Sequence, residues 1–221
     1  MRRILVLRPE PGASATARRI RGLGLEALVI PLFEIERVAW RAPDPSLFDG
    51  LLLTSAQAAR FGGEELSQLR SLKVYAVGEA TAEAARSTGF DVWATGEAGV
   101  EQLLAAVGRD FRLLHLCGED RKALDGGAQL ITQVVVYRSR AIEAPNLRGI
   151  SGSVALIHSP RAGRRLAELV DDRSSIALAA ISAAAADAAG DGWESSRAAQ
   201  YPTDDALLAL AARLCNNPPP E

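Results

Sequence analysis

The sequence predicts an α/β fold made of two similar, flavodoxin-like parallel-sheet domains that are joined by a two-stranded β linker. Three observations favour this fold. Short apolar runs, typical of buried parallel strands, alternate with Ala-rich stretches of helical character. Two long parts of the chain match each other at a fixed offset. Two extended runs stand at the junctions between these parts.

Strands and helices alternate along the whole chain. The first strand, Ile4–Leu7, precedes a helix over Ala13–Leu23, which Gly24 is suited to end. Further strands are expected at Ala27–Ile30, Leu51–Leu53, Val74–Val77, Val92–Ala94, Leu113–Leu116, Val154–Ile157 and Ile176–Ile181. Further helices are expected from Ser55, from Thr81 to Gly89, over Val100–Ala106, from Arg161, over Ala183–Ala189 and over Asp204–Leu214. Thr203 is a suitable N-cap for the last helix.

An internal repeat organises these elements. The matched pairs are 53–55 with 157–159, 76–85 with 180–189 and 99–105 with 203–209, all at an offset of 104, and more weakly 4–10 with 113–119. One such match could arise by chance in an Ala-rich chain. Four matches in the same order indicate two related α/β units.

The two extended runs, 33–40 and 131–138, predict how the chain is routed between the domains. Domain 1 is expected to comprise residues 1–36 and 139–221, and domain 2 residues 37–138, so that the chain crosses between them twice. The two runs would then pair as the linker. Ligands of open α/β sheets bind beyond the carboxyl ends of the strands, so this routing predicts a ligand cleft between the domains.

Composition excludes several classes of protein. The 25 basic and 27 acidic residues give a formal net charge of −2, which argues against a nucleic-acid partner because such proteins need a basic face. No apolar run reaches the roughly 18 residues of a membrane helix, and the first apolar run is too short for a signal peptide. A cytoplasmic protein without a membrane partner is therefore expected. No exposed apolar helix face calls for a partner subunit, so we expect a monomer.

The cysteines and histidines indicate no metal or disulfide. Cys117 and Cys215 lie far apart in the sequence and are expected to pack as small buried residues. His115 and His158 have no Cys, Asp or His neighbours at metal-ligand spacing. We therefore interpret both histidines as packed or hydrogen-bonded residues and expect no metal site.

The strand-to-helix turns carry the candidate binding residues. Thr54 and Ser55 follow one strand and open a helix, and Gly78 and Thr81 do the same after the next strand. A hydroxyl beside the N–H groups of a helix N-terminus suits a carboxylate or a phosphate. Ser and Thr are also ordinary helix caps, and this alternative stays open. Ser159 occupies the repeat position of Ser55.

Arg8, Gly118 and Tyr137 complete the set of candidates. Arg8 ends the first strand, where it would meet a ligand carboxylate or would be an ordinary surface arginine. Gly118 follows the matching strand of the second part. Strand alternation places Val135 and Tyr137 on one face of the second extended run. A phenol there is suited to donate a proton to a leaving hydroxyl, or it packs against the linker as an aromatic neighbour.

Six motifs in order resemble those of the uroporphyrinogen-III synthase family, over nearly the whole chain: RPEPG, LLLTSAQA, VYAVGEATAEAA, LHLCGED, VVVYR and HSPRAGRRL. The resemblance implies two α/β domains on a two-stranded linker. It also implies an enzyme of porphyrin biosynthesis, a carbon–oxygen lyase. Such an enzyme closes the linear tetrapyrrole hydroxymethylbilane into uroporphyrinogen III, inverting ring D and releasing water. No metal or organic cofactor is implied.

The resemblance also carries residue roles. The tyrosine of the family's returning linker strand falls on Tyr137 and is expected to help expel the substrate hydroxyl as water. The family's Gly-x-x-Thr turn falls on Gly78 and Thr81, and its Thr-Ser pair falls on Thr54 and Ser55. These residues are the expected substrate contacts of domain 2.

The sequence departs from the family pattern in the second copy of the repeat. Ser182 and Ala185 stand where the family has a glycine and a hydroxyl residue, and His158 stands where it has a threonine. The loop after Cys117 also leaves little room for the usual helix. Two alternatives to catalysis stay open. One is a two-lobe ligand-binding module, because two α/β lobes on a hinge resemble such modules. The other, which the change around Ser182 favours, is a synthase-like domain that only binds tetrapyrroles.

Overall fold

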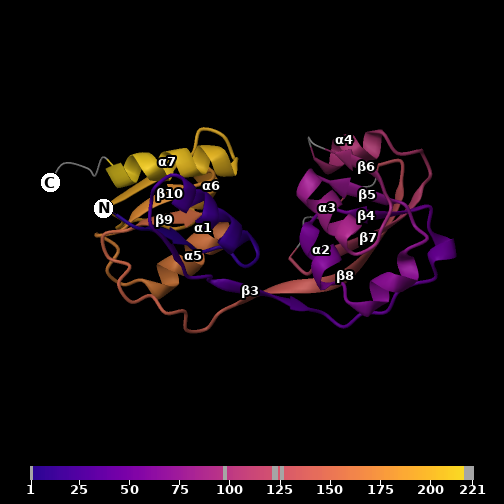
Figure 1. Ribbon diagram of the computed structural model, residues 1–221, viewed down its shortest axis with the longest axis horizontal. Coiled ribbons are helices and arrows are strands. Elements are labelled where there is room, and N and C mark those ends of the chain that lie inside the picture. Colours follow the sequence, from indigo (N-terminus) through magenta and orange to yellow (C-terminus); the bar gives the residue numbers. More distant parts are fainter. Residues whose placement is uncertain (1, 97–98, 121–123, 125–126, 217–221) are drawn as a thin grey trace. The chain divides into compact units, whose positions relative to one another are not determined.

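The chain forms two compact units, each built on its own sheet (Figure 1). The structure, a computed structural model, describes residues 2–96, 99–120, 124 and 127–216. Unit 1 combines Met1–Glu34 with Ala141–Glu221, and unit 2 is the continuous segment Ile35–Arg140. The predicted α/β class with two parallel-dominated sheets is confirmed.

Unit 1 contains a five-stranded parallel sheet. Its strands are β1 (Ile4–Val6), β2 (Ala27–Val29), β9 (Val154–Ile157), β10 (Ala177–Ala180) and β11 (Ser195–Ala198). They lie in the order β11-β10-β9-β1-β2, and each adjacent pair is parallel. Read along the chain, this is the 2-1-3-4-5 order of flavodoxin-like sheets.

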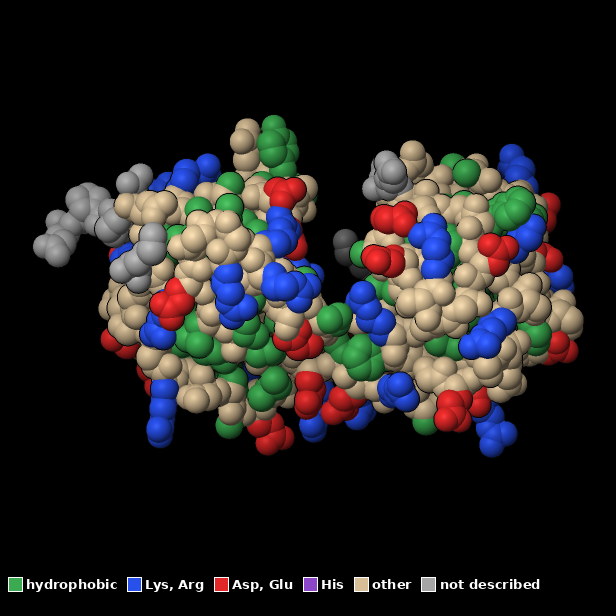
Figure 2. Space-filling model, viewed as in Figure 1, with side chains coloured by type: hydrophobic (Ala, Val, Ile, Leu, Met, Phe, Trp, Pro, Cys, Tyr) green, Lys and Arg blue, Asp and Glu red, His purple; other side chains and the backbone are tan. Residues whose placement is uncertain are grey.

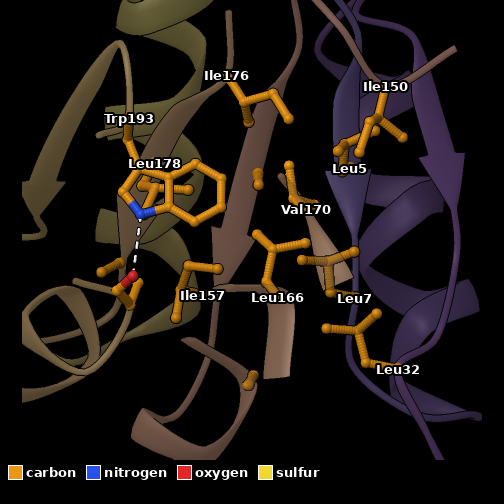
Figure 3. Close-up of a cluster of buried hydrophobic side chains, with 14 of the residues drawn as sticks. Leu5, Leu7, Leu32, Ile150, Ile157, Leu166, Val170, Ile176, Leu178 and Trp193 are labelled. Carbon is orange, nitrogen blue, oxygen red and sulfur yellow. Dashed lines mark hydrogen bonds between the residues drawn. The ribbon is translucent and has the colours of Figure 1, made fainter. Parts of the chain in front are cut away.

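Four helices cover the two faces of this sheet, because successive side chains of each strand point to opposite faces. The helices are α1 (Gly12–Gly22), α5 (Pro160–Leu169), α6 (Ala183–Asp187) and α7 (Asp204–Asn216). Ile4 of β1 packs in the cluster that includes side chains of α1 and α7. Leu5 packs in the opposite cluster, with Leu166 of α5, Leu178 of β10 and Trp193 (Figure 3). The buried Trp193 indole donates a hydrogen bond of 3.1 Å to the Ala189 carbonyl.

Unit 2 contains a six-stranded sheet, and five of its strands repeat the arrangement of the unit 1 sheet. Its strands are β3 (Phe33–Arg37), β4 (Gly50–Leu53), β5 (Val74–Val77), β6 (Val92–Gly96), β7 (Arg112–Gly118) and β8 (Leu130–Ala141). They lie in the order β3-β8-β7-β4-β5-β6. The five strands from β8 to β6 are parallel neighbours. They repeat the order of unit 1, with β7 and β8 in the places of β1 and β2.

The helices of unit 2 also divide between two apolar clusters. They are α2 (Ala56–Phe61), α3 (Glu79–Ser87) and α4 (Val100–Ala105), with short 3₁₀ turns η1 (Pro45–Leu47) and η2 (Glu64–Leu69). Leu114 and Leu116 of β7 pack in the cluster that includes residues of α2 and α3. Leu113 packs in the other cluster with Leu103 and Leu104 of α4.

The two extended runs of the sequence become β3 and β8, which are hydrogen-bonded neighbours. Their backbone bonds join Val38 N to Val136 O and Ile142 N to Leu32 O, at 3.0 Å each, so the strands run antiparallel. The second run is more than a linker, however. From Leu130 onward β8 also pairs in parallel with β7, as an interior strand of the sheet. The predicted domain boundaries, after residues 36 and 138, fall inside these two strands.

Within the described part of the chain, no helix is long and apolar enough to span a membrane. The expected loop after Cys117 falls largely on residues 121–123 and 125–126, which lie outside the described residues.

Candidate active site

A cavity of about 250 Å³ opens at the carboxyl ends of the central strands of unit 2. Residues in or directly after β4, β5, β7 and β8 form most of its wall, and one residue of α4 adds to it. The lining residues are Thr54, Val77, Val100, His115, Cys117, Gly118, Asp120, Leu124 and Tyr137. Three of the predicted site residues, Thr54, Gly118 and Tyr137, therefore meet at one cavity.

Thr54 lies at this cavity because it directly follows β4. Its Oγ1 is 3.0 Å from Nε2 of His115, which belongs to the neighbouring strand β7. The two strands are parallel, with Leu53 opposite Leu116, so both side chains reach the same edge of the sheet. His115 is buried and hydrogen-bonded, as the sequence interpretation expected, but its partner Thr54 was not predicted.

Tyr137 is half-buried and lies directly against Gly118. The pairing of β7 with β8 shifts here, so that Cys117 is opposite Val135 but Gly118 is opposite Tyr137. Such a bulge redirects the side chains that follow it. Both Val136 and Tyr137 pack against the α2–α3 cluster. Simple alternation along β8, which separates these two residues, therefore does not describe this point of the strand.

The contact between Tyr137 and Gly118 leaves no room for a side chain at residue 118. A Cβ atom on Gly118 would lie 2.7 Å from Cε2 and Cζ of the Tyr137 ring and 3.0 Å from its Oη. Carbon atoms in contact are normally about 3.5–4.0 Å apart. Gly118 therefore sets the position of the phenol.

The remaining candidates of unit 2 belong to helix starts. Ser55 is the N-cap of α2, and its hydroxyl accepts a hydrogen bond of 3.2 Å from Gln57 N. Gly78 is the N-cap of α3 with φ +80°, a left-handed conformation that favours glycine. Thr81 lies in the first turn of α3 and is only 5% exposed. Ser55 thus acts as a cap, and the glycine at residue 78 is explained by backbone conformation.

A second group of charged side chains lies at the carboxyl edge of the sheet in unit 1. Arg8, which follows β1, forms an ion pair with Asp204, the first residue of α7, at 3.0 Å. Arg19 Nη1 is 3.7 Å from the same Asp204 carboxylate, and His158 Nε2 is 3.6 Å from it. The guanidinium predicted to meet a ligand carboxylate therefore meets a carboxylate of the protein. Asp204 was not identified as a candidate from the sequence, although its position at the start of α7, within the internal repeat, could have indicated it.

His158 is uncharged at neutral pH in this environment. Burial is the main cause that lowers the pKa of His158 to about 4, and the nearby Arg8 guanidinium acts in the same direction. The Asp204 carboxylate opposes both.

The two copies of the repeat differ at their second turns. Ser159 caps α5 as Ser55 caps α2, and its hydroxyl accepts from Ala162 N at 3.2 Å. Ser182 is the N-cap of α6 with φ −155°, and its hydroxyl accepts from Ala185 N at 3.3 Å. The equivalent Gly78 has φ +80°. The serine at residue 182, where the family has a glycine, therefore occurs in a turn whose backbone conformation differs from that of the matching turn at Gly78.

Charge is dispersed over the face of the molecule in Figure 2, where acidic and basic side chains are interspersed on both units. Among the residues that the structure describes, no group of three or more His, Cys, Asp or Glu side chains is placed to hold a metal ion.

The sequence matches the family described as HEM4, uroporphyrinogen-III synthase HemD, over residues 14–209. The chain belongs to the HemD uroporphyrinogen-III synthase family. The resemblance drawn from the ordered motifs is confirmed by this match. A curated relative, the uroporphyrinogen-III synthase of Chlorobaculum parvum (strain DSM 263 / NCIMB 8327), is 32% identical over 101 residues. The matched segment spans 42% of this chain and 41% of that relative.

Solved structures share the HemD family fold. The crystal structure of uroporphyrinogen-III synthetase from Helicobacter pylori 26695 superposes with a TM-score of 0.70 and 20% identity, covering 97% of this chain and 100% of that one. A mutant uroporphyrinogen III synthase of the extremely thermophilic bacterium Thermus thermophilus gives a TM-score of 0.50 at 17% identity, covering 98% and 100% of the two chains. At these identities the likeness supports the fold alone.

Proposed function

We propose that the protein is a uroporphyrinogen-III synthase. It closes hydroxymethylbilane into uroporphyrinogen III with inversion of ring D and loss of water, as a carbon–oxygen lyase. Membership of the HemD family supports the reaction class. The observation that carries the proposal within the molecule is the half-buried Tyr137, which lines a cavity at the carboxyl edge of unit 2 beside Thr54. No metal or organic cofactor takes part in the proposed reaction.

Tyr137 is the proposed proton donor. The bond between the hydroxymethyl carbon and its oxygen breaks, the oxygen takes the phenol proton and leaves as water, and the carbon is left as a cation conjugated with its pyrrole. The phenolate that remains regains a proton when ring closure expels the hydrogen of the attacked pyrrole carbon, so the phenol is restored at the end of the cycle. A positioned acid of this kind contributes roughly 10²–10⁴-fold in rate.

Positioning is the other part of the proposed catalysis. The linear tetrapyrrole also closes without an enzyme, to the isomer in which ring D is not inverted. The protein must therefore hold the two ends of the linear tetrapyrrole so that the inverted product forms faster than the isomer that is not inverted. The substrate carboxylates are proposed to meet the turns at Thr54, Ser55, Gly78, Thr81 and Gly118 in unit 2. In unit 1, Arg8 and Ser159 are the proposed contacts.

The test is to supply hydroxymethylbilane to the purified protein and to measure the ratio of inverted to non-inverted macrocycle by chromatography. We expect the inverted isomer to dominate in the presence of the protein. Formation of the non-inverted isomer alone, at the rate found without protein, would refute the proposed activity.

A second candidate function is a tetrapyrrole-binding protein without turnover. The observation that favours it is the turn at Ser182, whose conformation differs from that of the equivalent Gly78. Binding of the product without acceleration of ring closure would support this second candidate. A monomeric state, a cytoplasmic location and the lack of a nucleic-acid partner remain predictions. Light scattering of the purified protein tests the first of these.

A further inference from the structure

A buried histidine stands among the leucines of a central strand. His115 is 1% exposed and lies between Leu114 and Leu116 of β7, both of which are fully buried. A buried polar group that lacks a hydrogen bond costs roughly 1–3 kcal/mol, so a histidine in such a strand requires a polar neighbour. One polar neighbour is Thr54, whose Oγ1 is 3.0 Å from His115 Nε2.

The fold itself does not require this histidine. In unit 2, His115 of β7 is paired with Leu52 of β4. At the matching place in unit 1, β1 carries Val6, paired with Leu156 of β9. Val6 is fully buried in the apolar cluster, and the same sheet order forms around it. The sheet order therefore does not explain the histidine, whereas its position does, because His115 lines the cavity of unit 2.

Both members of the pair line that cavity together with Tyr137. A threonine hydroxyl carries one proton, and a neutral imidazole carries one N–H. If Thr54 donates to the imidazole, its proton is used inside the protein. If His115 Nε2–H donates to Thr54, the hydroxyl proton is left to point into the cavity, where a substrate carboxylate or carbonyl is an acceptor.

Resting on the proposed function, we infer that His115 is a positioning residue for Thr54. Its Nε2–H donates to Thr54 Oγ1 and directs the Thr54 proton toward the tetrapyrrole. Tyr137 and His115 then have separate tasks at the same cavity: the phenol supplies a proton to the leaving hydroxyl, and the imidazole acts through the Thr54 hydroxyl that it orients.

The kinetic test uses a double-mutant cycle. Thr54→Val removes the hydroxyl with little change of shape, and His115→Leu removes the imidazole. Each variant should raise KM for hydroxymethylbilane about tenfold, the loss typical of one hydrogen bond, with kcat changed by less than about twofold. The double variant should have the KM of the single variants, because the second change removes a contact already lost. His115→Gln, which keeps a hydrogen-bond donor, should restore most of the affinity.

A matched control removes a hydroxyl elsewhere in the same unit. Thr88 Oγ1 donates to the Ala85 carbonyl at 2.9 Å, at the end of α3, and does not line the cavity. Thr88→Val should leave KM unchanged. If His115→Leu lowers the melting temperature but leaves KM unchanged, the histidine is structural and the inference is wrong. If the increase in KM in the double variant equals the product of the two single increases, the two residues act independently and the inference is also wrong.

A spectroscopic test does not depend on activity. The chain has only two histidines, so ¹⁵N imidazole spectra contain signals from two side chains. The signals that remain in His158→Gln belong to His115. We expect the proton of His115 on Nε2, and we expect Thr54→Val to shift the Nε2 signal. A proton on Nδ1 alone would mean that Thr54 donates to the imidazole, which overturns the inference. Failure of the wild-type protein to form the inverted macrocycle would instead refute the proposed function, while the ¹⁵N spectra still decide on the pair.

Discussion

Substitution of Gly118 by alanine displaces Tyr137 without altering its chemistry. The new Cβ would lie 2.7 Å from two carbons of the ring, and contact normally requires about 3.5 Å, so the ring must move by about 0.8 Å. The Gly118 backbone has no positive φ, so alanine causes no backbone strain there. A misplacement of about 1 Å at a reacting group lowers rates by as much as about 10²-fold. We expect Gly118→Ala to lower the rate of inverted product between about tenfold and 10²-fold.

The assay measures the initial rate and the isomer ratio with hydroxymethylbilane, together with the melting temperature. The share of the non-inverted macrocycle should rise in Gly118→Ala, because that isomer forms without the enzyme. In a Tyr137→Phe background the same substitution should have a much smaller effect on rate, because the proton donor whose position it changes is already absent.

Gly50→Ala is the matched control. A Cβ on Gly50 would lie 2.6 Å from Cε2 of Tyr75, so it forces a similar ring movement in the same sheet, at the start of β4. Overpacking of this kind costs about 1–3 kcal/mol in either variant. Both variants should melt at lower temperature, and only Gly118→Ala should change the isomer ratio. A well-folded Gly118→Ala with wild-type rate and isomer ratio would refute the reasoning.

The contacts of single residues lead to three further predictions. Tyr137→Phe should lower the rate of inverted product by about 10²-fold or less, with little change in melting temperature; an unchanged rate and isomer ratio would remove Tyr137 from the mechanism. Ser55→Ala should lower the free energy of unfolding by about 1 kcal/mol, because its hydroxyl caps α2 through Gln57 N; urea unfolding at unchanged midpoint would contradict the cap. The contribution of neutral His158 to the free energy of unfolding should be complete above the usual histidine pKa of 6.5 and should fall as the pH drops toward 4. In this range the unfolded chain binds a proton at His158 and the folded chain does not. Thermal melts of His158→Gln should show a weaker dependence in this window, and an identical dependence would exclude His158 as its cause.

The elements of this fold were predictable because local signals agree with the tertiary structure. The apolar run Ile4–Leu7 is buried on both faces of a parallel sheet, as such runs predict. Ser55 and Ser159 begin helices at the same offset that the repeat shows in the sequence. The binary pattern and the caps therefore carried the information about secondary structure and fold class.

The side-chain partners of the candidate site were not predictable in the same way. The pairing of Thr54 with His115 depends on β7 lying beside β4, which no local pattern states. The contact between Tyr137 and Gly118 depends on a bulge in one strand pair. Arg8 was expected to face a ligand, but Asp204, far along the chain, lies within ion-pair distance. Each contact is fixed by the register of distant segments.

The routing of the chain also sets an order for folding during synthesis. All strands of unit 2 lie within one continuous stretch of about a hundred residues, so this unit has every partner it needs once β8 has been made. The sheet of unit 1 must wait longer, because Ile4 in its interior strand β1 pairs with Val154 of β9. At about 5–20 residues per second, β1 remains with one edge unpaired for roughly 8–30 s. An unpaired apolar strand is a site for aggregation, so unit 1 is the part of the nascent chain that most needs protection by chaperones.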